Sequence, residues 1–175
     1  MKKYLKFFFL FLILFPVKSL AVIEVDITRG NLNPLPIAVS PLSLDEESKK
    51  ELKRILKKDE IGSDISIVVE NNLKASGLFN PLNKDAFLQK PDIAHLKPRF
   101  EDWALIKAQA LITGKVIYKD EKIRVEFRLW DILAGKEMMA LAFTTVPSNW
   151  RRVGHIITDK VYERLTGEKG YFDTR

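Results

Sequence analysis

Residues 110–143, with the sequence ALITGKVIYKDEKIRVEFRLWDILAGKEMMALAF, decide the fold of this chain. Their middle part alternates apolar side chains with the charged side chains of Arg124, Glu126 and Arg128, and this period of two is typical of a half-buried strand. Similar apolar runs at 110–118 and 139–143 are set apart from it by the polar stretch 119–122 and by Ala134-Gly135-Lys136. The pattern predicts a β-meander, three antiparallel strands joined by tight turns, with one apolar face.

The apolar face of such a sheet needs a cover, and two segments with helical periodicity can supply it. In the first, 63–76, Ser63 or Asp64 can cap the N-terminus, and Gly77 suits the left-handed position that ends a helix. In the second, 149–166, we expect one face to be buried and the other to lie in solvent. The face expected to be buried consists of Val153, Ile156, Ile157, Val161 and Leu165, and the outward face of Arg152, His155, Asp159, Tyr162 and Glu163.

The chain before the meander adds a strand and further helices. Residues 36–42 form a short apolar run bounded by prolines, which indicates another strand of the sheet. Residues 43–60 begin with the capping-box pattern Ser43-x-x-Glu46 and predict a solvated helix with balanced charges. A loop is expected at 83–99 and a short helix at 100–108. The prediction is an α+β fold, a mixed β-sheet packed by helices on one face.

Residues 1–21 have the layout of a secretory signal peptide. Lysines precede an unbroken apolar run at 7–15, Pro16 ends the run, and Ser19-Leu20-Ala21 supplies small residues for a signal peptidase. The run is far shorter than the roughly 20 residues that span a bilayer, so we expect cleavage after Ala21, export and no stable membrane insertion afterwards. Because this segment carries four lysines and no acid, the net charge falls from +6 for the whole chain to +2 for the mature chain. That charge does not support binding of nucleic acid.

Residue types needed for catalysis are scarce. The chain has no cysteine, which excludes thiol catalysis and zinc–cysteine sites. Of its two histidines, His95 lies in the predicted loop and is expected to be a surface residue. His155 lies one helical turn from Asp159, but a catalytic zinc site needs three protein ligands. Without a phosphate loop, a nucleophile motif or an apolar setting for paired carboxylates, the sequence predicts a binding module with no catalytic residues, metal or cofactor.

Three stretches resemble the N-terminal domain of TolB. They are the N-terminal segment with Gly30 that leads into Pro36-Ile37-Ala38-Val39, the helix end and strand at 72–82 (NLKASGLFNPL), and residues 150–175 (WRRVGHIITDKVYERLTGEKGYFDTR). The resemblance implies an α/β module similar in fold to the anticodon-binding domains of class II aminoacyl-tRNA synthetases. It also implies a periplasmic component of the Tol-Pal system, which keeps the outer membrane invaginating during division and is exploited by bacteriocins for import.

The resemblance also implies partners. In the TolB family, the extreme N-terminal arm docks TolA by adding a strand to a sheet edge, and a β-propeller binds the lipoprotein Pal. Alternation of apolar and polar side chains in the arm of this chain fits strand addition, although it equally fits an edge strand of the domain itself. Carried onto this chain, the TolA-contacting residues are Val22, Ile23, Glu24, Val25, Asp26, Ile27, Thr28, Arg29, Gly30, Asn31, Leu32 and Asn33.

The predicted organisation is a signal peptide at 1–21, an N-terminal arm at 22–35, a TolB N-terminal domain at 36–166 and a linker at 167–175. Since family members continue from this point into the first propeller blade, we expect the sequence to be a fragment of a longer protein. Pal binding is expected only if a propeller follows. Two alternatives are a nucleic-acid-binding module of the anticodon-binding kind and an envelope hydrolase. The first predicts salt-sensitive binding of single-stranded RNA, and the second needs catalytic groups that the sequence does not offer.

Overall fold

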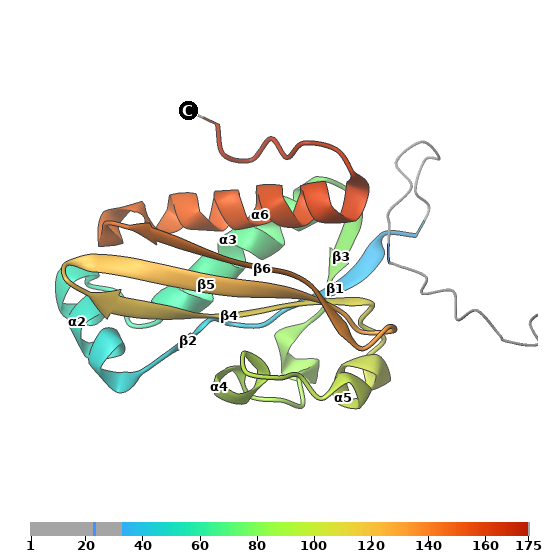
Figure 1. Cartoon of the computed structure of the whole chain (residues 1–175), viewed down its shortest axis with the longest axis horizontal. Helices are drawn as coiled ribbons and strands as arrows, with labels where there is room; N and C mark the ends of the chain where they lie inside the picture. Colours follow the sequence, from blue (N-terminus) through green and yellow to red (C-terminus); the bar gives the residue numbers. More distant parts are fainter. Residues whose placement is uncertain (1–22, 24–32, 175) are drawn as a thin grey trace, which may run out of the picture.

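A mixed β-sheet forms the centre of the molecule (Figure 1). The computed structural model describes residue 23 and residues 33–174. Strand β1 pairs in parallel with β3 and β4, whereas β4, β5 and β6 pair antiparallel. A short strand, β2 (Ser43–Leu44), also runs parallel to β4. Across the sheet the order is β3 (Phe79–Pro81), β1 (Leu35–Val39), β4 (Ala110–Lys119), β5 (Lys122–Asp131) and β6 (Lys136–Thr145).

The predicted meander is confirmed, with strands longer than the sequence pattern indicates. Strands β4 and β5 are joined by Asp120 and Glu121, whose φ angles of 49° and 59° are those of a two-residue turn that matches the twist of a hairpin. Strands β5 and β6 are joined through Gly135, with φ of 63°. The alternation in β5 corresponds to the two faces of the sheet. Val125, Phe127 and Leu129 are fully buried on one face.

Helices α3 (Ile61–Ala75) and α6 (Trp150–Thr166) cover that side of the sheet, as predicted (Figure 1). The two helices pack against each other, and they come close at Gly154, where an added Cβ would lie 2.9 Å from Cβ of Val68. Helix α2 (Glu46–Leu56) closes one end of the layer by inserting Leu52. The main core between sheet and helices includes Ile37, Ile65, Leu73, Ile112, Phe127, Leu129, Ile157 and Leu165.

The opposite side of the sheet is covered only at one end. Helices α4 (Pro91–Ala94) and α5 (Phe100–Leu105) lie there, and the short 3₁₀ helix η1 (Lys84–Ala86) precedes them. A second apolar cluster forms beneath them around Trp103, Leu111 and Trp130. Gln89 is buried in this segment, where its Oε1 accepts hydrogen bonds from the Trp103 indole (3.1 Å) and the Arg99 amide (2.9 Å). The segment expected to be a plain loop is therefore an ordered cover for the sheet.

Two predicted helix caps are wrong. Ser43 lies in β2, and the cap of α2 is Asp45, whose carboxylate accepts the Ser48 amide at 2.7 Å. That hydrogen bond holds the pKa of Asp45 below its ordinary value. Helix α3 begins at Ile61 with no side-chain cap, while Asp64 forms an ion pair with Lys58 at 2.8 Å. The αL conformation predicted for Gly77 is confirmed, with φ of 73°.

Residues 167–174, here called the strap, follow α6 and turn back along its outer surface (Figure 1). Helix α6 ends at Gly167, whose amide donates to the Glu163 carbonyl at 2.9 Å. A 3₁₀ turn, η2 (Pro147–Asn149), precedes the helix. Tyr162, expected in solvent, is only 8% exposed, because Tyr171 and Phe172 of the strap pack edge-on against its ring. Burial raises the pKa of Tyr162.

Within the described part of the chain, no helix combines the length and apolar character needed to cross a membrane.

Candidate functional site

Most of the predicted TolA-docking arm falls outside the described residues. This applies to Val22, Glu24, Val25, Asp26, Ile27, Thr28, Arg29, Gly30, Asn31 and Leu32, and to the whole predicted signal peptide. Ile23 packs against the edge of the main core, and its amide lies 3.4 Å from Oδ2 of Asp131. Asn33 is exposed immediately before β1. The assignment of the arm to TolA binding therefore stays a prediction.

Asp131 lies at the end of β5, where it is fully buried. Its Oδ1 accepts the Ala134 amide at 2.8 Å, which shapes the turn into β6, and its Oδ2 faces Ile23. A buried carboxylate needs such donors, because removal from water without them is costly. Ile23 is thus placed beside the turn between β5 and β6.

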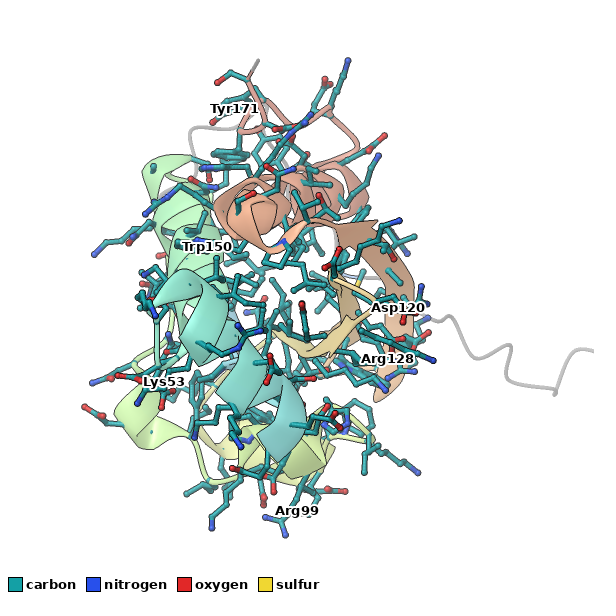
Figure 2. The ribbon with its side chains drawn as sticks, turned by 90° about the vertical axis from the view of Figure 1, so that its left-hand side faces the viewer. Lys53, Arg99, Asp120, Arg128, Trp150 and Tyr171 are labelled. Atoms are coloured by element: carbon teal, nitrogen blue, oxygen red, sulfur yellow. The ribbon has the colours of Figure 1, made fainter. Side chains whose placement is uncertain are left out.

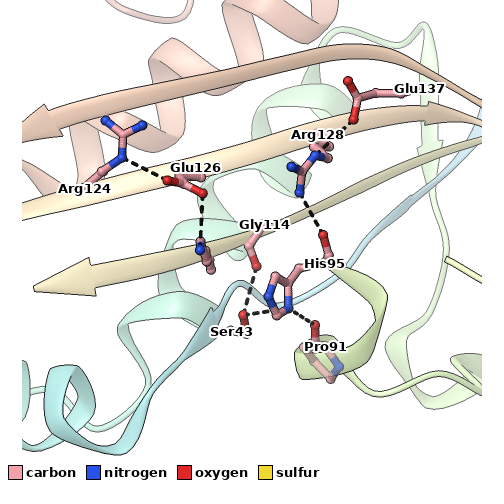
Figure 3. Close-up of polar contacts among 9 residues, drawn as sticks. Ser43, Pro91, His95, Gly114, Arg124, Glu126, Arg128 and Glu137 are labelled. Carbon is pink, nitrogen blue, oxygen red and sulfur yellow. Dashed lines mark hydrogen bonds and ion pairs between the residues drawn. The ribbon is translucent and has the colours of Figure 1, made fainter. Parts of the chain in front are cut away.

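The open part of the second sheet face carries two neighbouring groups of polar side chains (Figure 3). Arg124 donates to Glu126 at 2.9 Å within β5, and Lys115 of β4 lies 3.5 Å from the other carboxylate oxygen. The hydrogen bond from Arg124 holds the pKa of Glu126 below its usual 4.5; Lys115 adds to this effect and partial burial opposes it. Arg128 pairs with Glu137 of β6 at 3.0 Å. These pairs tie the three meander strands together across their exposed face.

His95 joins the second group from the end of α4. Its carbonyl accepts a hydrogen bond from Nη1 of Arg128 at 3.0 Å, and its Nδ1 lies 3.2 Å from Oγ of Ser43 (Figure 3). Nδ1 also lies 3.3 Å from the carbonyl oxygen of Pro91, and Ser43 Oγ donates to the Gly114 carbonyl at 3.3 Å. The His95 ring, predicted to be a surface side chain, is half-buried and fastens α4 to the sheet.

The Ser43–His95 pair does not form a nucleophile with its base. The Pro91 carbonyl can only accept a hydrogen bond, so Nδ1 carries the ring hydrogen when it bonds there. The Ser43 hydroxyl in turn has its own acceptor in Gly114. A serine nucleophile needs the reverse arrangement, in which an unprotonated ring nitrogen accepts the hydroxyl hydrogen and a third group orients the ring. The cluster thus holds α4, β2 and β4 in place.

A shallow hollow of about 240 Å³ lies beside these side chains, between Lys115, Arg124 and Arg128. Its border toward β6 consists of the small residues Ala140 and Ala142, which are exposed at the edge of the sheet. No group of three or more histidine or acidic side chains able to hold a metal ion occurs at residue 23 or within 33–174. The hollow offers charged and apolar contacts, which suit binding better than chemistry.

The outward stripe predicted on α6 is only partly correct. His155 is half-buried, and its Nδ1 lies 2.9 Å from Nδ2 of Asn72 on α3. The same amide group donates to Thr158 at 3.2 Å, so a polar contact links α3 and α6. Asp159 is also half-buried, and it accepts hydrogen bonds from the strap. Sequence periodicity missed these contacts because both partners, Asn72 and the strap, come from other parts of the chain.

Comparison with known proteins gives matches of three kinds: to a family, to relatives in sequence and to solved structures. The TolB amino-terminal domain family matches residues 23–138. A relative named "Tol-Pal system protein TolB", from Pelagibacter ubique (strain HTCC1062), is 77% identical over 171 residues, which are 98% of this chain and 38% of that protein. The crystal structure of TolB from Acinetobacter baumannii superposes with a TM-score of 0.64 at 20% identity, over 87% of this chain and 33% of that one. The structural match supports the fold alone.

A mixed sheet covered on one face by two long helices defines an α+β domain. The chain belongs to the TolB amino-terminal domain family. It spans about two fifths of the length of the TolB relative that it matches.

Proposed function

We propose that the chain is the N-terminal adaptor domain of a TolB protein and acts through protein–protein contacts in the Tol-Pal system of the periplasm. The observation that carries this proposal is the 77% identity to a Tol-Pal system protein TolB along nearly the entire chain. The domain would reach the periplasm through cleavage of residues 1–21, and it would contribute to outer-membrane integrity, cell division and bacteriocin import.

Docking of TolA through residues 22–33 is the specific contact proposed. Ile23, Val25 and Ile27 alternate with Glu24, Asp26 and Thr28, so an extended arm would have an apolar face and a polar face, and its backbone edge could pair with a partner strand. In strand addition, backbone hydrogen bonds supply affinity and every second side chain supplies specificity. Ile23 itself contacts Asp131 at the end of β5, which is consistent with an arm that begins near the sheet. Pal would be bound by a propeller following this domain.

The experiment measures binding of the TolA C-terminal domain to the mature chain by isothermal titration calorimetry. Val25→Pro removes one backbone N–H from the added strand and should abolish binding, whereas Val25→Ala keeps that N–H and should weaken binding only partly. Removal of residues 22–33 should act like Val25→Pro. The melting temperature of each variant serves as the folding control.

Unchanged affinity in the truncated chain would refute docking through the arm. Loss of folding on truncation would instead make the segment a strand of the domain itself. Equal losses for Val25→Pro and Val25→Ala would show that the side chain, not backbone pairing, is recognised.

A further inference from the structure

The strap is bound to α6 through its backbone as well as its side chains. The carboxylate of Asp159 accepts the amides of two successive strap residues, Phe172 at Oδ1 (2.7 Å) and Asp173 at Oδ2 (3.1 Å). Hydrogen bonds to a charged acceptor are the stronger ones in proteins. One side chain of the helix therefore captures consecutive peptide groups of the outgoing chain.

A second ionic contact lies two helical turns before Asp159. Arg152 and Asp173 form a two-pronged pair, with Nε 3.0 Å from Oδ1 and Nη2 3.0 Å from Oδ2. Paired contacts of this kind fix orientation as well as distance. Since Arg152 and Asp159 lie on the same side of α6, the strap runs back along the helix from Gly167 toward its middle.

Shape complementarity adds to these polar contacts. At Gly170 an added Cβ would lie 2.4 Å from Cα of Asp159, so only glycine allows the strap to lie this close to the helix. Phe172 packs against the main core. The ring of Tyr171 stacks on the ring of Phe172, with centroids 4.4 Å apart. Tyr171 lies on the far side of α6 from α2 and the sheet (Figure 2). A flexible linker would show none of this fit.

We propose that the strap is a clamp, anchored by Asp159, that fixes the point and direction in which the polypeptide leaves this domain. The TolB relative is longer than this chain, so a following domain would be held beside α6 instead of moving on a loose tether. The clamp does not depend on the proposed docking of TolA, which involves the other end of the chain.

The chain contains no cysteine, so pairs of introduced cysteines can carry spin labels without background. Labels at Lys50→Cys on α2 and Thr174→Cys in the strap report how firmly the strap is held, through the width of their distance distribution. Labels at Lys50→Cys and Lys160→Cys, both at exposed positions of helices, report on the domain alone. Amide hydrogen exchange at Phe172 and Asp173 gives an independent measurement.

In the unmodified chain we expect a narrow Lys50–Thr174 distribution and protected amides. Asp159→Ala should broaden the distribution and speed exchange of both amides by about tenfold or more, the effect of losing bonds to a charged acceptor. Asp159→Asn retains one acceptor oxygen and should give an intermediate result. Gly170→Val should release the strap through steric conflict without altering α6. The Lys50–Lys160 distribution should stay narrow in all variants.

The proposal is overturned if the unmodified chain already gives a broad Lys50–Thr174 distribution and unprotected amides. It is equally overturned if Asp159→Ala and Gly170→Val leave both measurements unchanged. If Asp159→Ala also broadens the Lys50–Lys160 distance distribution, this variant perturbs the domain itself. The result for Gly170→Val then decides whether the clamp exists.

Discussion

Replacing Gly154 with alanine should destabilise the domain, although alanine is the better helix former. The added Cβ would lie 2.9 Å from Cβ of Val68 and 2.8 Å from its Cγ1. Because Cβ of Val68 is fixed to the α3 backbone, the helices must separate to relieve the contact. Overpacking a dense core costs about 1–3 kcal/mol, and the gain in helix propensity is about 1 kcal/mol. We expect a net loss of up to about 2 kcal/mol in the free energy of unfolding.

Urea unfolding followed by tryptophan fluorescence measures this loss, and a double-mutant cycle with Val68→Ala tests its cause. Val68 is buried, so its truncation alone should be destabilising. In the Gly154→Ala background the same truncation removes a clashing atom and should cost clearly less, with a coupling of about 0.5 kcal/mol or more. A stabilising Gly154→Ala, or equal costs of Val68→Ala in both backgrounds, would refute the close approach of α3 and α6.

Three further results are expected. His155→Ala should lower the free energy of unfolding by about 0.5–1.5 kcal/mol through loss of the contact with Asn72. Lys160→Ala on the exposed face should change it by less than about 0.5 kcal/mol. The midpoints of urea unfolding of the two variants test this difference. Gln89→Leu should lower the free energy of unfolding, measured by thermal unfolding, by about 1–3 kcal/mol, because the Trp103 indole loses its buried acceptor. A smaller loss of stability in a Trp103→Phe background would confirm this cause. The pKa of Glu126 is lowered in the folded state, so its ionised form stabilises the fold fully above the unfolded pKa of 4.5, and this stabilisation is lost as pH falls through the folded pKa. Glu126→Gln should therefore flatten the dependence of unfolding free energy on pH between pH 6 and 3. The same dependence in the variant and the unmodified chain would count against the role of Arg124.

The sheet and its two main helices were predictable because their signals are local. Alternation in β5 and the spacing of Val153, Ile157 and Val161 each arise within one element and one buried face. The cap of α2 was misplaced because Ser43 and Asp45 are both good caps, and the pairing of Ser43 with β4 decides between them. Tyr162 was misplaced because its ring is covered by Phe79 of β3 and by Tyr171 and Phe172 of the strap, which lie elsewhere in the sequence. Contacts between distant segments produce no periodic pattern of apolar residues in the sequence.

The polar set on the open sheet face was not predictable for the same reason. His95, Ser43 and Arg128 come from three separate regions and meet only because α4 folds against β4 and β5. The docking arm remains a prediction, since Ile23 and Asn33 are its only described members.

The position of β1 in the middle of the sheet has a consequence for folding order. Ile37 pairs with Ala110, roughly 70 residues later in the chain, whereas the β4–β5 hairpin closes through two turn residues. The entropic cost of closing a loop rises with the logarithm of its length, so pairing β1 with β4 costs about 3 kcal/mol more than closing the β4–β5 hairpin. We therefore expect the meander to form early and β1 to insert late. A chain synthesised from its N-terminus cannot complete its sheet until β4 has emerged, so the pairing of β1 with β4 is delayed through most of synthesis.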